Sequence, residues 1–217
     1  MNRAGVSRRT LLSATLIGTT VALAGCKVVS IAEQKKEADS GAFDAKAWAD
    51  QLWAPRVLPY FSANAKPMPD VLRAISADFD QAGKTLGYRP ASEGSPWTFV
   101  VSGAGSVLEK NTESRAGTLS VALDGADPDQ PVTLQIGPVI IGSAIRDSLP
   151  FVNFKDFTNQ IEFADAGKAL TALALLAISR DLPTIKVGSR IKFTGAFSLS
   201  GKSDTIKVTP AALMVTP

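Results

Sequence analysis

The sequence predicts an α+β fold in which two N-terminal helices precede a small domain of five strands and one long helix. Three observations predict it. Apolar residues recur at helical spacing early in the chain, alternate at the two-residue period of strands after Pro96, and return to helical spacing for one long stretch further on. We therefore expect a helical preface over residues 43–95 and a sheet domain over residues 96–217.

The first helix of the preface is predicted over residues 43–54. Apolar residues recur there at helical spacing and place Trp48 and Trp53 on one face. Core packing is the simpler role for both rings, and stacking on a ligand is the alternative. Pro55 and Pro59 are expected to end this helix, because proline lacks the amide hydrogen that a helix interior needs.

A loop over residues 55–69 and then a second helix are predicted. Asp70 has the side chain of a helix N-cap, and apolar residues follow it at helical spacing. Gly83 or Gly87 is expected to end the helix, since glycine readily adopts the backbone conformations found just past a helix end.

Five strands are predicted after Pro96, where valine, phenylalanine and threonine become frequent. They cover residues 98–109, 117–123, 131–141, 185–199 and 205–215. Gly103 and Gly105 permit the bulge or sharp bend that closing a small sheet requires. Gly137-Pro138 breaks the third strand, and residues 200–204 form a hairpin loop between the last two strands.

One long helix is predicted over residues 156–180, with an apolar face broad enough to plug a core. Three strands, a helix and two strands are the element order of the oligonucleotide/oligosaccharide-binding (OB) barrel. In such barrels the helix closes one end, and the second and third strands with their neighbouring loops form the usual binding face. An α+β sandwich with the same element order is the alternative.

The N-terminal segment has the features of a bacterial lipoprotein signal peptide. An arginine pair precedes an apolar stretch over residues 11–23, which is too short to span a bilayer and leads into Ala24-Gly25-Cys26. We expect residues 1–25 to be removed, Cys26 to carry the lipid, and residues 26–42 to form a polar tether. The protein would then face the periplasm from the inner or the outer membrane, after export by the general or the twin-arginine route.

The composition excludes several kinds of chemistry. The chain has no histidine and a single cysteine, which excludes Cys/His zinc sites, Ser-His-Asp triads, imidazole proton shuttles and a disulfide within the mature chain.

The net charge of +3 lies in the leader, because removal of its three arginines leaves 20 of the 23 basic residues against 20 acidic ones. A neutral chain with few aromatic residues on its strands argues against nucleic-acid binding. We expect no cofactor and no metal site.

Three segments carry a resemblance to a known family. They read GAGSV (103–107), IGPVIIGSAIRD (136–147) and FVNFKDFTNQIEFA (151–164). In them the chain resembles the predicted periplasmic lipoprotein family, a domain of unknown function often encoded beside ABC-type sugar uptake systems. The resemblance implies an exported, lipid-anchored domain with a link to sugar transport. It implies no reaction, because the family has no established catalytic residues.

Five polar residues lie among apolar neighbours between the third strand and the long helix, where they would form a polar ligand site or a structural cluster: Arg146, Asp147, Asn159, Gln160 and Glu162. A structural role is the first explanation, because buried polar groups need hydrogen-bond partners in any fold. Arg146 would pair with a nearby carboxylate. Asn159 or Gln160 would satisfy backbone groups freed at Gly137-Pro138, and Asp156 would cap the long helix.

Three functions are consistent with these features. The first, which we predict, is a non-enzymatic accessory or binding module that is anchored by lipid beside a sugar uptake system and contacts a transporter component or a small polar solute. The second is an enzyme that acts on periplasmic glycans through carboxylates such as Asp147 and Glu162, and glycoside hydrolysis would need these roughly 5–9.5 Å apart across a cleft. The third is a purely structural envelope lipoprotein, which the sequence does not separate from the first.

Overall fold

The computed structural model describes residues 43–89, 95–127 and 129–216. The predicted signal peptide (1–25) and the predicted tether (26–42), with the lipidation site Cys26, lie outside these ranges. None of the helices in the described ranges combines the length and the hydropathy of a membrane span.

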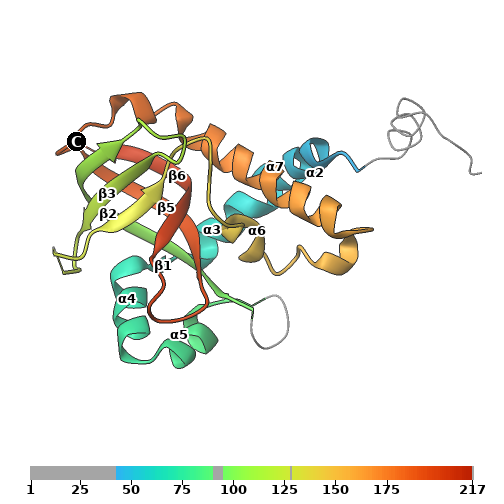
Figure 1. Cartoon of the computed structure of the whole chain (residues 1–217), viewed down its shortest axis with the longest axis horizontal. Helices are drawn as coiled ribbons and strands as arrows, with labels where there is room; N and C mark the ends of the chain where they lie inside the picture. The colour runs from blue at the N-terminus through green and yellow to red at the C-terminus, as the bar shows by residue number, and fades with distance from the viewer. Residues whose placement is uncertain (1–42, 90–94, 128, 217) are drawn as a thin grey trace, which may run out of the picture. The chain divides into compact units, whose positions relative to one another are not determined.

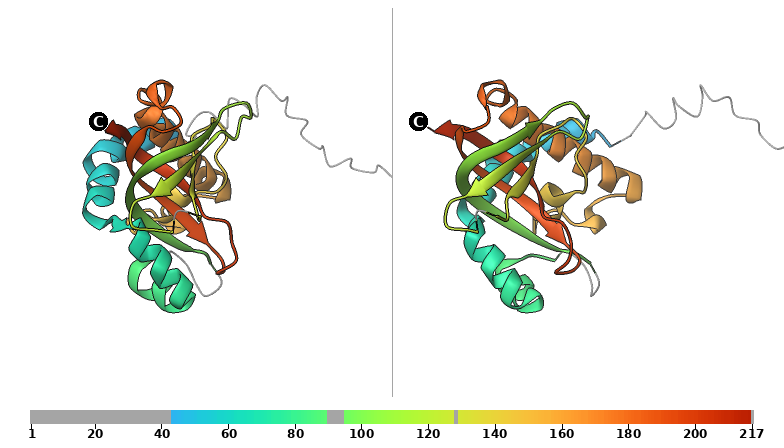
Figure 2. Two further views of the ribbon diagram at one scale, coloured as in Figure 1. Left: turned by 90° about the vertical axis from the view of Figure 1, so that its left-hand side faces the viewer. Right: turned by 60° about the vertical axis from the view of Figure 1, so that its left-hand side comes forward.

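Five strands pair into a closed ring, as the alternating pattern after Pro96 predicts (Figures 1 and 2). The strands are β2 (Trp97–Asn111), β3 (Thr118–Leu123), β4 (Val132–Gln135), β5 (Arg190–Leu199) and β6 (Lys207–Thr216). They follow the order β2-β3-β4-β6-β5, and β2 and β5 pair antiparallel over ten residues to close the ring. Strands β4 and β6 are parallel, and a two-residue strand, β1 (Lys66–Pro67), adds to β2 in parallel.

Strand β4 ends at Gln135, well before the predicted end of the third strand at residue 141. The chain leaves the sheet here because Gly137 lies directly against the backbone of Gly117, whose carbonyl oxygen accepts a hydrogen bond from the Gly137 amide at 3.0 Å. A Cβ atom at Gly137 would lie 2.2 Å from the Gly117 nitrogen, so this contact requires glycine. The sequence correctly places the break at Gly137-Pro138.

The bulge of β2 lies at Leu108 and not at the glycines, because the register with β3 shifts between Val107 and Glu109. Of the two alternatives predicted for Gly103 and Gly105, a bulge or a sharp bend, the bulge therefore lies elsewhere in the strand. Gly105 instead allows β2 and β3 to approach closely, since a Cβ atom there would lie 2.1 Å from the carbonyl oxygen of Ala122.

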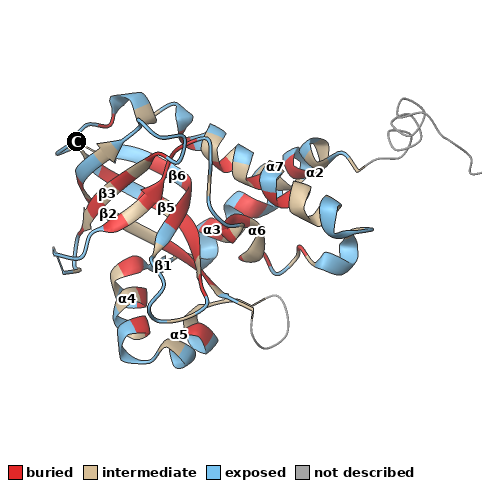
Figure 3. Cartoon of the chain, viewed as in Figure 1, coloured by how far each residue is buried: buried red, intermediate tan, exposed pale blue. Residues whose placement is uncertain are grey.

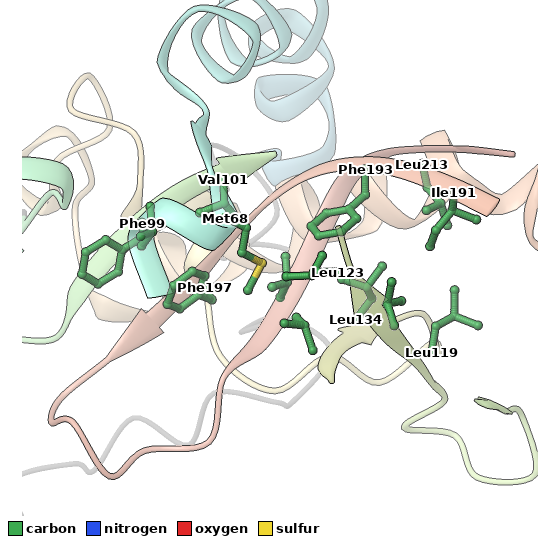
Figure 4. Close-up of a cluster of buried hydrophobic side chains, with 14 of the residues drawn as sticks. Met68, Phe99, Val101, Leu119, Leu123, Leu134, Ile191, Phe193, Phe197 and Leu213 are labelled. Atoms are coloured by element: carbon green, nitrogen blue, oxygen red, sulfur yellow. The ribbon is translucent and has the colours of Figure 1, made fainter. Parts of the chain in front are cut away.

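The interior of the ring is filled by side chains from alternate strand positions. Phe99 on β2 and Phe197 on β5 are paired in register and stack with ring centroids 5.2 Å apart, and both are fully buried. Met68, the first residue of helix α4 (Met68–Ala77), is also fully buried and belongs to the same cluster (Figure 4). The preface therefore contributes to the core of the sheet.

A second hydrophobic cluster covers the outer face of β2, β5 and β6. Val100, Ala196 and Ala211 pack there against helices α2 (Ala45–Leu52), α3 (Leu58–Asn64), α6 (Ala144–Asp147) and α7 (Gln160–Ser179), whose inner faces are buried (Figure 3). Among the buried residues of α7, Ile178 alone belongs to the interior cluster. The long helix is therefore a cover along the side of the ring, and the prediction that it plugs the core holds only for its last turn.

The prolines do not end the first helix, contrary to the prediction. Helix α2 continues through a π-helical segment over Trp53–Val57 into α3. In that segment the Leu58 amide bonds to the Trp53 carbonyl five residues back, and Pro55 lies inside the wider turn. Pro59 lies in the first turn of α3, where a missing amide hydrogen costs little. The predicted loop over residues 55–69 is therefore mostly helical.

The second predicted helix is two helices, α4 and α5 (Phe79–Leu86). Asp78 separates them and caps α5, because its carboxylate accepts a hydrogen bond from the Gln81 amide at 3.0 Å. Asp70 is not an N-cap, since it lies within the first turn of α4. Gly87 follows α5 as predicted. The described part of the preface thus holds four α-helices, and the expectation of two helices is wrong.

We expect Phe197→Ala to lower the free energy of unfolding by about 3–5 kcal/mol, because it removes a fully buried ring and leaves a cavity beside Phe99. Phe154→Ala is the matched control. Phe154 is 50% exposed, and its removal should cost no more than about 1.5 kcal/mol. Urea denaturation of the full chain measures both losses, and equal losses would contradict the assignment of Phe197 to the core.

Candidate functional site

Arg146 lies in α6, the short helix between β4 and α7. Its neighbours Ala144 and Ile145 are buried in the outer cluster and fix this helix against the ring. The Arg146 side chain extends toward α7, where its Nη1 donates a hydrogen bond to the carbonyl oxygen of Phe163 at 3.0 Å. The side chain is only 13% exposed, so its charge needs compensation nearby.

Asp147 and Ser143 provide that compensation. Arg146 Nε donates to Asp147 Oδ1 at 2.8 Å, and Nη2 donates to Ser143 Oγ at 3.0 Å. The Ser143 hydroxyl in turn donates to Asp147 Oδ2 at 2.6 Å, so both carboxylate oxygens are engaged. The predicted pairing of Arg146 with a nearby carboxylate is present, and the network joins α6 to α7.

The guanidinium also lies over the ring of Phe163, with Cζ 3.7 Å from the ring centroid. Gly167, one turn further along α7, leaves the room that this requires, because a Cβ atom there would lie 3.1 Å from Arg146 Nη1. One N–H of Nη1 has no partner among the described residues. Arg146 is therefore held in place while keeping a donor for a further contact.

Arg146 and Asp147 line a pocket of about 250 Å³, together with Ser95, Pro96, Thr98, Val152, Asn153, Phe154 and Phe163. Aromatic rings and a few hydrogen-bonding groups converge there, which is the usual make-up of a small-molecule site. The volume lies below the roughly 300–1,000 Å³ of pockets for drug-sized ligands, so an occupant would be small.

The other three predicted site residues lie outside this pocket. Asn159 is the N-cap of α7, and its side-chain oxygen accepts hydrogen bonds from the amides of Ile161 at 2.9 Å and Glu162 at 3.0 Å. The Glu162 carboxylate accepts from the Thr158 amide at 2.9 Å, and Gln160 is exposed. These residues begin the helix, and the structure does not join them to Arg146 and Asp147.

Two structural assignments from the sequence are wrong. Asp156 does not cap the long helix, since it lies in the short 3₁₀ turn before it and accepts a hydrogen bond from the Asn153 amide. Beyond Gly137-Pro138 the Val139 amide donates to the Arg115 carbonyl oxygen at 3.0 Å. Gln135 bonds to Ile141, because its Oε1 accepts from the Ile141 amide at 2.9 Å and its Nε2 donates to the Ile141 carbonyl oxygen at 3.2 Å. Buried Gln135 sits inside a strand pattern, which gives no signal of this role.

Sequence reasoning also missed most of the pocket. Asn153, Phe154 and Phe163 lie in the segment that carries the family resemblance, and this is the one signal that could have selected them. Thr98 comes from the start of β2, where its hydroxyl hydrogen-bonds with that of Ser198 at 2.9 Å. Its place in the pocket depends on ring closure, so no local pattern could reveal it.

Two other pockets are larger, and neither lining includes a carboxylate or a side-chain amide. One, of about 420 Å³, lies on the outer face of β2, β5 and β6 between Lys192 and Met214. The other, of about 500 Å³, lies between α7 and the loop of residues 138–143, and Arg146 forms part of its wall. Within the ranges that the structure describes, no three Asp, Glu, Cys or His side chains gather as a metal site would need.

The ring order and the helix between β4 and β5 define an OB-type fold. The chain is similar to the crystal structure of an OB-fold protein from Thermotoga maritima, with a TM-score of 0.64 and 17% sequence identity, over 80% of this chain and 99% of that one. At this identity the likeness concerns the fold alone. No curated protein matches the chain.

The family gives a closer assignment. Residues 16–214 match the family described as predicted periplasmic lipoprotein (DUF2291), and the chain belongs to that family. This confirms the resemblance seen in the sequence. The protein is accordingly a predicted periplasmic lipoprotein, anchored at a membrane.

We expect Arg146→Lys to lower the free energy of unfolding by about 1–3 kcal/mol, because the single ammonium group cannot serve all the partners of the guanidinium. The matched control is Arg73→Lys, since Arg73 pairs with Asp70 on the exposed surface of α4 and should lose less than about 0.5 kcal/mol. Thermal unfolding compares the two. A loss at Arg146 as small as the control would show that the network does not hold α6 to α7.

Proposed function

We propose that this lipoprotein is a non-enzymatic accessory or binding module, anchored through lipidated Cys26, that holds a small polar solute in the Arg146 pocket beside a solute-uptake system. The observation that carries the proposal is the pocket itself. It places a fixed guanidinium, a carboxylate and an amide beside two aromatic rings in a space of about 250 Å³. Such a combination can orient a small molecule through hydrogen bonds while its less polar face lies on the rings.

Binding is favoured over carbohydrate hydrolysis by the positions of the carboxylates. Asp147 accepts hydrogen bonds on both oxygens, from Arg146 and from Ser143, and so is occupied by the protein itself. Glu162 lies at the start of α7, bonds to the Thr158 amide, and does not line the pocket with Asp147. Asp147 and Glu162 therefore do not line a common pocket, and the geometry supports a binding role better than it supports glycoside hydrolysis.

The proposed partner is a component of an ABC-type uptake system, and a sugar is the solute that the family resemblance suggests. Anchoring would keep the module near such a permease in the same membrane. A small solute pocket on an anchored domain fits delivery or sensing of a solute at the membrane surface. A purely structural envelope protein would need no such pocket.

Mature lipoprotein extracted from membranes in a mild detergent provides the test. Native mass spectrometry should detect a small-molecule adduct on the wild-type chain, or one acquired from a panel of neutral sugars. Phe154→Ala should weaken binding about tenfold or more, because Phe154 forms a wall of the pocket. The adduct mass would identify the solute.

Leu176→Ala is the control for this experiment. Leu176 is also a large exposed apolar residue, but it lies near the end of α7 and does not line the pocket. It should bind as the wild type does. No adduct on the wild-type chain, or equal binding by both variants, would contradict the proposed site and favour a structural role.

A further inference from the structure

Five aromatic rings form a continuous chain of contacts at one end of the molecule, which we call the aromatic end: Phe43, Trp48, Phe154, Phe157 and Phe163. Each neighbouring pair meets edge to face, with centroids 5.3–5.9 Å apart. The start of α2 and the start of α7 meet here, at the right-hand end of Figure 1. The cluster therefore joins the first described residues to the N-terminal turn of the long helix.

The aromatic end also exposes apolar side chains. Ile161, in the first turn of α7, is 72% exposed, and Phe154 is 50% exposed. The residues from Phe157 to Ile161 carry no charge, and the chain around them is exposed (Figure 3). Two large apolar side chains are therefore exposed where the chain enters α7, in the segment that also contributes Phe157 and Phe163 to the ring cluster.

The position of the lipid anchor indicates what that surface contacts. Phe43 belongs to the aromatic end, and sixteen residues, 27–42, separate it from Cys26. Even a fully extended chain of this length reaches at most roughly 60 Å. With Cys26 lipidated, this end of the domain would be held within that distance of the bilayer, at an effective concentration on the order of mM, where even a weak contact is frequently formed.

We infer that the aromatic end rests on the lipid bilayer, with Ile161 entering the headgroup region and the aromatic rings behind it. The inference depends on the anchoring at Cys26 that the proposed function includes. Exposed aliphatic and aromatic side chains bury in this boundary layer at depths of roughly 5–10 Å. The domain would thus lie on the membrane in a fixed orientation.

The contact is apolar in character and not electrostatic. The two segments that form this end, residues 43–48 and 153–165, hold four carboxylates and two lysines. Two of the carboxylates, Asp44 and Asp156, accept hydrogen bonds from backbone amides. They would not attract anionic lipids. We therefore expect the contact to persist at high salt, whereas a contact made by surface charges would weaken.

A single introduced cysteine tests the inference in the full lipidated protein, because the sulfur of Cys26 is its only other thiol and would be blocked. Ile161→Cys carries an environment-sensitive fluorophore in vesicles of phosphatidylethanolamine and phosphatidylglycerol, with spin-labelled lipid as the quencher. Leu176→Cys is the control, being 67% exposed and about 22 Å further along the same helix. Neither position lines the Arg146 pocket.

We expect quenching at position 161 to be several-fold stronger than at 176, at low and at high salt. Equal quenching at both positions, or quenching at 161 that salt abolishes, would overturn the inference while leaving the anchor and the solute site intact. Mass spectrometry of the same sample checks Cys26. An unmodified Cys26 would overturn the anchor in the proposed function and the membrane contact with it. Failure of the anchor is thereby distinguished from failure of the membrane contact alone.

Discussion

The antiparallel pairing of β2 with β5 is the interaction on which the rest of the structure depends. It joins residues 97–106 to residues 190–199 and so closes the chain between them into a long loop. Phe99 and Phe197 face the interior, while Val100 and Ala196 face the helices. The β2–β5 pairing therefore supports both clusters. A register shift of one residue would turn the interior side chains of a strand outward and its outer side chains inward.

The sequence predicted the parts of the fold that follow local periodicity. Alternation located the strands because burial alternates along them, and the hairpin between β5 and β6 followed from the loop at residues 200–204. The preface was predicted less well. In the π-helical turn around Pro55 the buried side chain of Val57 packs in the outer cluster, and such packing overrides the local breaking signal of proline. The split at Asp78 has a local cause, because the Asp78 side chain caps α5.

The candidate site, like the fold, has a part that the local sequence predicts and a part that depends on tertiary packing. Arg146 and Asp147 are adjacent in sequence, so their pairing could be expected from the chain alone. Asn159 and Glu162 have the spacing of a helix start, and the structure uses them to begin α7. The pocket is different because its walls come from segments that only ring closure and the docking of α7 bring together. Thr98 is the plainest case, since it is far in sequence from Arg146, Asp147 and Asn153.

The network around Arg146 also bears on the charge of a bound solute. An anionic solute would have to compete for the guanidinium with Asp147, which is already bonded to it at 2.8 Å and shielded with it from water. A neutral polar solute needs no such exchange, because it can bind beside the ion pair and leave the bond between Arg146 and Asp147 intact. The contacts that fix α6 to α7 would therefore favour a neutral occupant of the proposed site, and the structural role of Arg146 is compatible with the proposed binding role.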